Sequence, residues 1–256
     1  MGQRESHDPG TFSWVDLATS DAGGAKAFYG ELFGWEFDDS EMPGGGVYTM
    51  CLVRGDAVAA IVQQEEQPGH WNSYVTVASA DETAAKARQL GANVLEEPFD
   101  VMEAGRMAVF ADPSGGMLCA WQPRENIGAY RVNDPGCMTW NELQTRDPRT
   151  TAAFYAELFG WEMEPQEDDG KLAYVIIRNA GRSNGGIMPM SEQHGDAPSY
   201  WLAYFTVTSA DDAVEKAREL GGTVQAGPME LGAGRIAVLT DPQGAAFAVF
   251  EGDTDD

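Results

Sequence analysis

The nine-residue stretch FYGELFGWE at positions 28–36 recurs with one substitution as FYAELFGWE at positions 154–162. The two copies are 126 residues apart (28 to 154). Three upstream residues return at the same spacing: Trp14, Leu17 and Asp21 as Trp140, Leu143 and Asp147. Repetition at a fixed offset marks a duplicated structural unit. The chain is therefore predicted to be a tandem duplication of one domain.

Matches near the end of each half complete the repeat. They are Ser79-Ala80-Asp81 with Ser209-Ala210-Asp211, Leu90-Gly91 with Leu220-Gly221, and Asp112-Pro113 with Asp241-Pro242. A chain of 256 residues accommodates two domains of ordinary size, about 100–150 residues each. Residues 124–136 contain Pro, Gly and Asn, which is typical of a linker. We expect domains at 12–123 and 137–251, a flexible tail at 1–11 and an acidic tail at 252–256.

Each half shows the same order of predicted elements. Asp21 is a predicted N-cap, the apolar residues that follow have helical spacing, and Gly34 ends that helix. Ser79 with Glu82 forms a capping box for a second helix. The other apolar stretches are short and bounded by turn residues, as strands are. Each half is therefore predicted to contain two consecutive β-α-β-β-β modules. The whole chain is then an α+β fold of four modules.

The spacing from Asp21 to Phe28-Tyr29 and Gly34-Trp35, joined to Asp112-Pro113 and Gly115 before the last strand, forms a specific signature. On these motifs, residues 12–251 resemble the glyoxalase/bleomycin-resistance/extradiol-dioxygenase family, also called the vicinal-oxygen-chelate superfamily. The resemblance implies that paired modules curl into two cup-shaped half-barrels. Each cup would hold a small molecule, often against a divalent metal.

The metal positions that the resemblance implies carry unsuitable residues here. The two first-strand positions are Trp14 and Trp140, neither of which binds a cation. The other aligned positions are Asn72, Leu202, Cys119 and Ala248, and the fourth strands at 57–62 and 185–190 contain no His or Glu. A divalent metal requires three or four converging ligands. His70 with Cys119 would make a poor site, so we expect no metal and no other cofactor.

Strand alternation identifies the residues that face each cup. If Trp14 faces inward, so does Asp16, and Trp140 with Glu142 repeats the pair. A carboxylate desolvated against an indole has a raised pKa and can act as a general base or bind a ligand hydroxyl. Asp16 and Glu142 are therefore the candidate catalytic residues, the alternative being a structural, hydrogen-bonded role. The candidate ligand-binding residues are Trp14, Asn72, Tyr74, Cys119 and Trp121 in the first cup and Trp140, Tyr204 and Phe250 in the second.

The aligned inner positions differ in polarity between the cups. Asn72, Cys119 and Trp121 become Leu202, Ala248 and Phe250, so the second cup lacks an amide, a thiol and an indole N–H. Because specific recognition needs fixed polar groups, we expect the first cup to be the better site. Arg106 and Arg235 open strands and either clamp an anionic group or lie at the surface.

Composition restricts the partners. The 41 acidic against 16 basic side chains give a net charge of −25, which repels nucleic acid and anionic membranes. No apolar run approaches the ~20 residues of a membrane span, and residues 1–10 lack the apolar region of a signal peptide. Three widely spaced cysteines suggest no disulfide framework. We expect a cytoplasmic protein, a monomer or homodimer, whose partner is a small molecule.

Three functions fit these observations. The first is a metal-independent protein that binds a small hydrophobic or planar molecule, for resistance, sequestration or tailoring of a secondary metabolite. The second is a metal-dependent glyoxalase-type lyase/isomerase or a dioxygenase with atypical ligands. The third is a non-catalytic scaffold whose cups are filled by side chains. Fold alone does not separate them, because one fold hosts unrelated chemistries.

Overall fold

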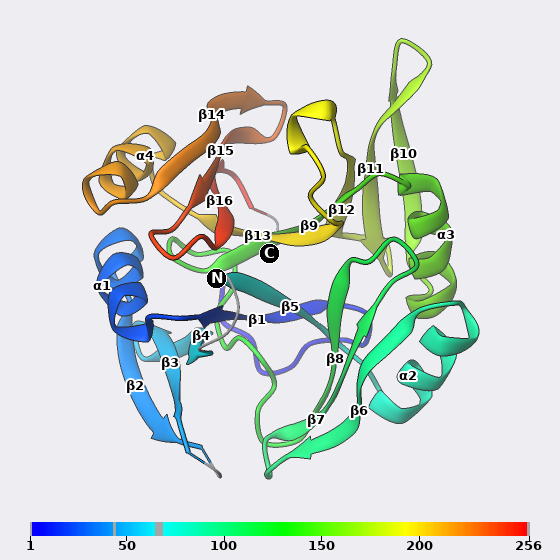
Figure 1. The fold of residues 1–256 in the computed structure, drawn as a ribbon, viewed down its shortest axis with the longest axis horizontal. Helices are drawn as coiled ribbons and strands as arrows, with labels where there is room; N and C mark the ends of the chain where they lie inside the picture. The colour runs from blue at the N-terminus through cyan, green and yellow to red at the C-terminus, as the bar shows by residue number, and fades with distance from the viewer. Residues whose placement is uncertain (1, 43–44, 65–68, 255–256) are drawn as a thin grey trace.

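The computed structural model describes residues 2–42, 45–64 and 69–254, and Figure 1 shows their arrangement. The elements of the first half are β1 (Phe12–Thr19), α1 (Ala22–Phe33), β2 (Glu36–Glu41), β3 (Val47–Val53), β4 (Asp56–Gln63), β5 (His70–Thr76), α2 (Ala80–Gln89), β6 (Asn93–Val101), β7 (Gly105–Ala111) and β8 (Met117–Pro123). Those of the second half are β9 (Met138–Thr145), α3 (Pro148–Phe159), β10 (Glu162–Asp168), β11 (Lys171–Asn179), β12 (Arg182–Pro189), the 3-10 helix η1 (Glu192–His194), β13 (Tyr200–Thr206), α4 (Ala210–Glu219), β14 (Thr223–Leu231), β15 (Gly234–Thr240) and β16 (Ala246–Gly252).

Each half forms one eight-stranded sheet. The strand order is β2-β3-β4-β1-β5-β8-β7-β6 in the first sheet, and the second sheet repeats it as β10-β11-β12-β9-β13-β16-β15-β14. The central pair β1 and β5 is antiparallel and joins the two modules of the half, as β9 and β13 do in the second. The predicted α+β duplication of four βαβββ modules is confirmed. The sheets are open and are not closed into barrels.

The predicted helix caps are present. The Asp21 side chain accepts a hydrogen bond from the Gly24 N–H, and Gly34 ends α1 at φ 71° in the left-handed region that glycine adopts without strain. The Ser79 side chain accepts from the Glu82 N–H at the start of α2. The second half repeats these caps with Asp147, Gly160 and Ser209.

The two sheets pack back to back through their central strands. Val15 and Leu17 on β1 are fully buried, and the Ser73 hydroxyl donates to the Asn141 side chain across the interface at 2.7 Å. Figure 1 shows α1 beside α4 at one edge of the molecule and α2 beside α3 at the other, and these pairs are in contact. Asp16 alternates with Val15 and Leu17, so its side of the sheet faces away from the other half. We call that side the first concave face and its counterpart around Glu142 the second.

Reciprocal hydrogen bonds tie the halves together through the family signature. The Tyr29 hydroxyl donates to Asp241 at 3.0 Å and accepts from the Trp71 indole at 3.1 Å. The second half repeats this triad at 2.9 and 3.2 Å with Tyr155, Asp112 and Trp201. All six side chains are buried. The Tyr of each helix and the Asp of each turn are therefore structural residues of the interface between the halves.

The amino-terminal segment, expected as a loose tail, lies along the linker. The Arg4 N–H donates to the Tyr130 carbonyl at 2.9 Å, and Gln3 pairs with Arg131 in an isolated bridge. The ring of His7 in this segment is half-buried and bonds the Ala129 carbonyl at 2.8 Å. Linker backbone groups that no sheet satisfies are paired in this way. Positions 1 and 255–256 of the two expected tails lie outside the described residues.

Candidate functional site

A buried carboxylate lies at the centre of the first concave face. Asp16 on β1 is 4% exposed and accepts hydrogen bonds from the Tyr74 hydroxyl at 2.6 Å and the Asn72 amide at 2.8 Å. Tyr48 on β3 is a further hydrogen-bond partner of this carboxylate and accepts from the Trp14 indole at 3.2 Å. The structure therefore brings together four of the residues predicted for the first cup and adds Tyr48.

The second concave face repeats the cluster with different details. Glu142 on β9 is 5% exposed and accepts from the hydroxyls of Tyr174 at 2.7 Å and Tyr204 at 2.9 Å. The Gln144 amide donates to the same carboxylate at 2.5 Å. The Trp140 indole donates to the Tyr174 hydroxyl at 3.0 Å. The predicted Trp140, Glu142 and Tyr204 thus lie together.

Sequence reasoning missed one tyrosine in each cluster. Tyr48 and Tyr174 lie on β3 and β11, far along the chain from the carboxylates that they contact. A signal was present, because the two tyrosines are separated by the same 126 residues (48 to 174) as the other repeated positions. The duplicated unit is therefore an indole, a carboxylate and two phenols.

Burial determines the electrostatics of both clusters. It raises the pKa of Asp16, while hydrogen bonds from Tyr74 and Asn72 act in the opposite direction. Burial likewise raises the pKa of Glu142, opposed by Tyr174, Tyr204 and Gln144. The hydrogen-bond donors are neutral hydroxyl and amide groups, and the charge of the nearby His70 also lowers the pKa of Asp16. Each can accept a ligand hydroxyl or take up a proton.

The residues at the family's metal positions do not fit a divalent ion. In the strand register Trp14 lies opposite Tyr74, which lies beside Cys119, whereas Asn72 lies opposite Asp16 one row away. The second half places Leu202 opposite Glu142 and Ala248 beside Tyr204, so it offers even fewer ligand atoms. Within the ranges that the structure describes, no group of three or more His, Cys, Asp or Glu side chains converges.

The predicted Cys119 is a buried, protonated thiol. It is 3% exposed on β8, beside Tyr74. Burial raises the pKa of the thiol, and the nearby Asp16 carboxylate raises it further. Because the thiolate is the nucleophilic form, Cys119 acts here as a small apolar side chain of the first face.

The first concave face is covered at one end, and we call the covering segment, residues 126–131, the strap. The Trp121 indole donates to the Asn126 carbonyl at 2.9 Å, and the Ala129 N–H donates to the Ser13 carbonyl at 2.7 Å. The Tyr130 N–H donates to the Ala57 carbonyl at 2.8 Å. The strap thus runs from β8 past β1 to β4.

The two faces consequently differ in exposure. Trp14 and Trp121 are 4% and 7% exposed, whereas Trp140 and Phe250 are half-buried. After β16, the Thr254 hydroxyl donates to the linker at Asn133 instead of crossing the second face. The predicted Trp121 is therefore part of a closed wall, and the predicted Phe250 belongs to an open one.

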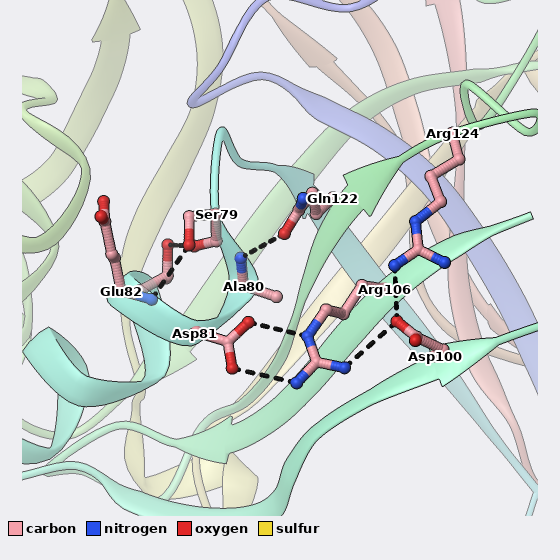
Figure 2. Close-up of polar contacts among 9 residues, drawn as sticks. Ser79, Ala80, Asp81, Glu82, Asp100, Arg106, Gln122 and Arg124 are labelled. Carbon is pink, nitrogen blue, oxygen red and sulfur yellow. Dashed lines mark hydrogen bonds and ion pairs between the residues drawn. The ribbon is translucent and has the colours of Figure 1, made fainter.

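Arg106 does not serve as a free anion clamp. Figure 2 shows its guanidinium making two hydrogen bonds to Asp81 at the start of α2 and one to Asp100, which also accepts from Arg124. The Gln122 side chain accepts from the first N–H of the same helix, at Ala80. The second half repeats the arrangement with Arg235 and Asp211. These arginines fasten a helix to the convex side of each sheet.

Family comparisons agree with this architecture. Residues 11–119 match the model of the Glyoxalase/Bleomycin resistance protein/Dioxygenase superfamily, and residues 140–250 match that of a glyoxalase-like domain. The chain belongs to this superfamily. No helix of the described residues is long and apolar enough to cross a membrane.

Two curated relatives extend over nearly the whole chain. "Putative glyoxylase CFP32" of Mycobacterium tuberculosis (strain CDC 1551 / Oshkosh) is 40% identical and is aligned over 98% of both chains. "Anthracycline biosynthesis protein DauV" of Streptomyces sp. (strain C5) is 32% identical over 95% of this chain and 94% of its own. Among solved structures, the Mn(II)-bound glyoxalase from Novosphingobium aromaticivorans superposes with a TM-score of 0.67. At 16% identity over 100% of this chain and 85% of its own, it shares the fold.

Proposed function

We propose that this protein binds a small, planar and largely apolar molecule on a concave face without a metal. The observation that carries the proposal is the buried carboxylate of each face, held by phenol hydroxyls and flanked by an indole. Small-molecule sites combine apolar and aromatic walls with a few fixed polar groups. The relative that is named for anthracycline biosynthesis supports an aromatic ligand and a role in tailoring, resistance or sequestration.

The carboxylates supply the chemistry that a tailoring step would need. A buried Asp16 or Glu142 with a raised pKa can receive a proton from a bound hydroxyl or carbon acid, and the adjacent phenols can stabilise the charge that develops. Sequestration would use the same groups as hydrogen-bond partners only. A tailoring enzyme would convert the bound molecule and a sequestering protein would not, but both would use the same binding site.

A metal-dependent lyase is the second candidate, and the glyoxylase name of the relative CFP32 favours it. Against it, the side chains at the aligned positions are mainly indole, amide and aliphatic groups, and each carboxylate is already bonded by neutral donors. A scaffold role is the third candidate, and the buried wall of the first face favours it for that half alone.

Elemental analysis and ligand titration separate these candidates. Protein prepared without affinity-tag histidines is expected to carry well below one equivalent of Zn, Fe, Mn or Ni and to bind planar aromatic compounds with saturable quenching of indole emission. A stoichiometric metal that survives dialysis, with activity lost to a chelator and restored by the metal, would favour the lyase. No saturable change across aromatic polyketides and flavonoids would favour the scaffold.

A further inference from the structure

The two concave faces belong to different parts of the hydrophobic interior. On the first face, Trp14, Tyr74 and Trp121 pack into the large core of the molecule, together with Ala129 of the strap. The aromatic residues of the second face form a separate, smaller cluster. Its buried members are Leu202, Tyr204, Ile236 and Ala248, and its half-buried edge includes Trp140, Tyr200 and Phe250.

Trp140 stands apart from every other tryptophan. The chain has seven, and six of them are buried: Trp14, Trp35, Trp71, Trp121, Trp161 and Trp201. A half-buried indole beside Tyr200 and Phe250 gives a planar surface on which a flat ring can stack. The second face therefore leaves part of its aromatic surface exposed to solvent, where a ligand can bury it.

Tyr200 adds a hydrogen-bond donor at this edge. It lies opposite Gln144 on the neighbouring strand, diagonal to Glu142, and is half-buried. Among the contacts of the described residues its hydroxyl has no hydrogen-bond partner, whereas the Tyr174 and Tyr204 hydroxyls both bond Glu142. The Tyr200 hydroxyl is thus available to a ligand.

Glu142 supplies a neighbouring acceptor. One carboxylate oxygen accepts from Tyr204 and Gln144, and the other, Oε2, accepts from Tyr174 alone. A carboxylate oxygen can accept two hydrogen bonds, so Oε2 has capacity for one more donor. The Tyr200 hydroxyl and the remaining acceptor position of Glu142 Oε2 therefore lie on diagonal positions of adjacent strands, within reach of one small molecule.

The first face lacks this pair. The position of Tyr200 corresponds to His70 (70 to 200, the offset of 130 seen for 79 to 209), and Gln144 corresponds to Ala18. Trp14 and Trp121 are closed off from solvent by packing and by the strap. A phenol beside a half-buried indole occurs only in the second half among the described positions of the repeat.

We propose that the second concave face is the ligand site, and that it selects a planar ring system carrying a hydroxyl next to a carbonyl oxygen. The ring stacks on Trp140 and Phe250, the ligand hydroxyl donates to Glu142 Oε2, and the ligand carbonyl accepts from the Tyr200 hydroxyl. This inference rests on the proposed function and narrows it to one half and one ligand class. It reverses the ranking of the cups that polarity alone suggested.

The test compares two probes that differ only in hydroxyl groups: quinizarin, a dihydroxyanthraquinone, and anthraquinone itself. Equilibrium dialysis with the full-length protein is expected to give one equivalent of quinizarin per chain and tighter binding of quinizarin than of anthraquinone. Tyr200→Phe removes no bond within the protein, so folding is preserved. It should weaken quinizarin binding by about tenfold, the range of one hydrogen bond, and should also weaken anthraquinone binding, because anthraquinone keeps the carbonyl that Tyr200 contacts.

Matched variants locate the site. Tyr130→Phe removes an exposed phenol of the strap and should leave binding of both probes unaltered, while Glu142→Gln should weaken quinizarin binding. If Asp16→Asn weakened binding and Tyr200→Phe did not, or if two equivalents bound, the proposed function would stand and this inference would fall. Equal affinity for the two probes would also overturn it. If neither probe bound to the unmodified protein, both proposals would fall together.

Discussion

The two concave faces have the same fold and the same indole-carboxylate-phenol cluster, yet one is closed and the other is open. In the first half, Trp121 bonds the strap and lies against Gly105, where a Cβ atom would come within 2.5 Å of the indole. In the second half, the corresponding Phe250 is half-buried, and Thr254, the last described residue, bonds the linker at Asn133. The duplicated polar cluster therefore has different surroundings in the two halves, because the segments that pack against each copy differ.

The interface between the halves shows the opposite behaviour. The Tyr29–Asp241 and Tyr155–Asp112 hydrogen bonds, at 3.0 and 2.9 Å, are nearly identical in the two copies. Both hydrogen bonds lie in the one interface between the halves, so the packing of that interface constrains both copies in the same way. The aromatic side chains of the concave faces, by contrast, differ in exposure between the two copies.

The first prediction has the largest expected effect and concerns the closed wall. Trp121→Ala should lower the free energy of unfolding by about 3–5 kcal/mol, because it empties a packed position and removes the bond to the strap. Phe250→Ala should lower the free energy of unfolding by roughly 1–2 kcal/mol less than Trp121→Ala does, because the Phe250 ring is already partly exposed to solvent. Urea unfolding of both variants, followed by circular dichroism, measures the difference.

The control for this pair is the slope of the unfolding transition. An unchanged slope in both variants means that the difference in midpoint reports stability. Equal losses for Trp121→Ala and Phe250→Ala would show that the two walls are packed alike, and the contrast between the faces would then be wrong.

The second prediction concerns the buried carboxylates. Burial raises the folded-state pKa of Asp16 above its ordinary value of 3.8, so the folded protein holds this proton more tightly than the unfolded chain. Stability from this group is therefore fully present below pH 3.8 and is lost as pH rises through the folded pKa. Each unit by which the pKa is raised corresponds to about 1.4 kcal/mol.

Asp16→Asn isolates that contribution, because an amide does not titrate. We expect the unfolding free energy of the unmodified protein, minus that of the variant, to fall as pH rises above 3.8. Glu142→Gln should show a fall in the same direction, starting from 4.5, because burial also raises the pKa of Glu142. Denaturation at a series of pH values tests this, and a difference that rises with pH would contradict the burial of a proton-binding carboxyl.

Local sequence signals predicted most of the fold. The repeat, the caps at Asp21 and Ser79 and the apolar strands come from contacts within a few residues, which the sequence displays directly. The edge strands β2 and β10 were not located, because they carry mainly exposed acidic residues and lack the alternation of a half-buried strand. Their existence depends on pairing with β3 and β11, which is a tertiary contact.

The candidate site was predictable in its residues and not in its accessibility. Strand alternation placed Trp14 beside Asp16 and Trp140 beside Glu142, and the structure brings each pair into one cluster. Whether a face is open depends on the strap, whose position follows from backbone bonds to Ser13 and Ala57 far away in the chain. No local pattern in residues 126–131 encodes those partners.

The last prediction has the smallest effect and tests the contrast without any ligand. Acrylamide quenches the emission of indoles that it can reach, and Trp140 alone among the seven tryptophans is half-buried while the others are at most 7% exposed. Trp140→Phe should therefore remove most of the quenchable fraction of the emission, and Trp14→Phe should leave that fraction nearly unchanged. Phenylalanine keeps an aromatic ring on the wall, so far-ultraviolet circular dichroism should be the same for both variants. A larger loss of quenchable emission from Trp14→Phe would mean that the first face is the open one, and the assignment of the ligand site to the second half would fail with it.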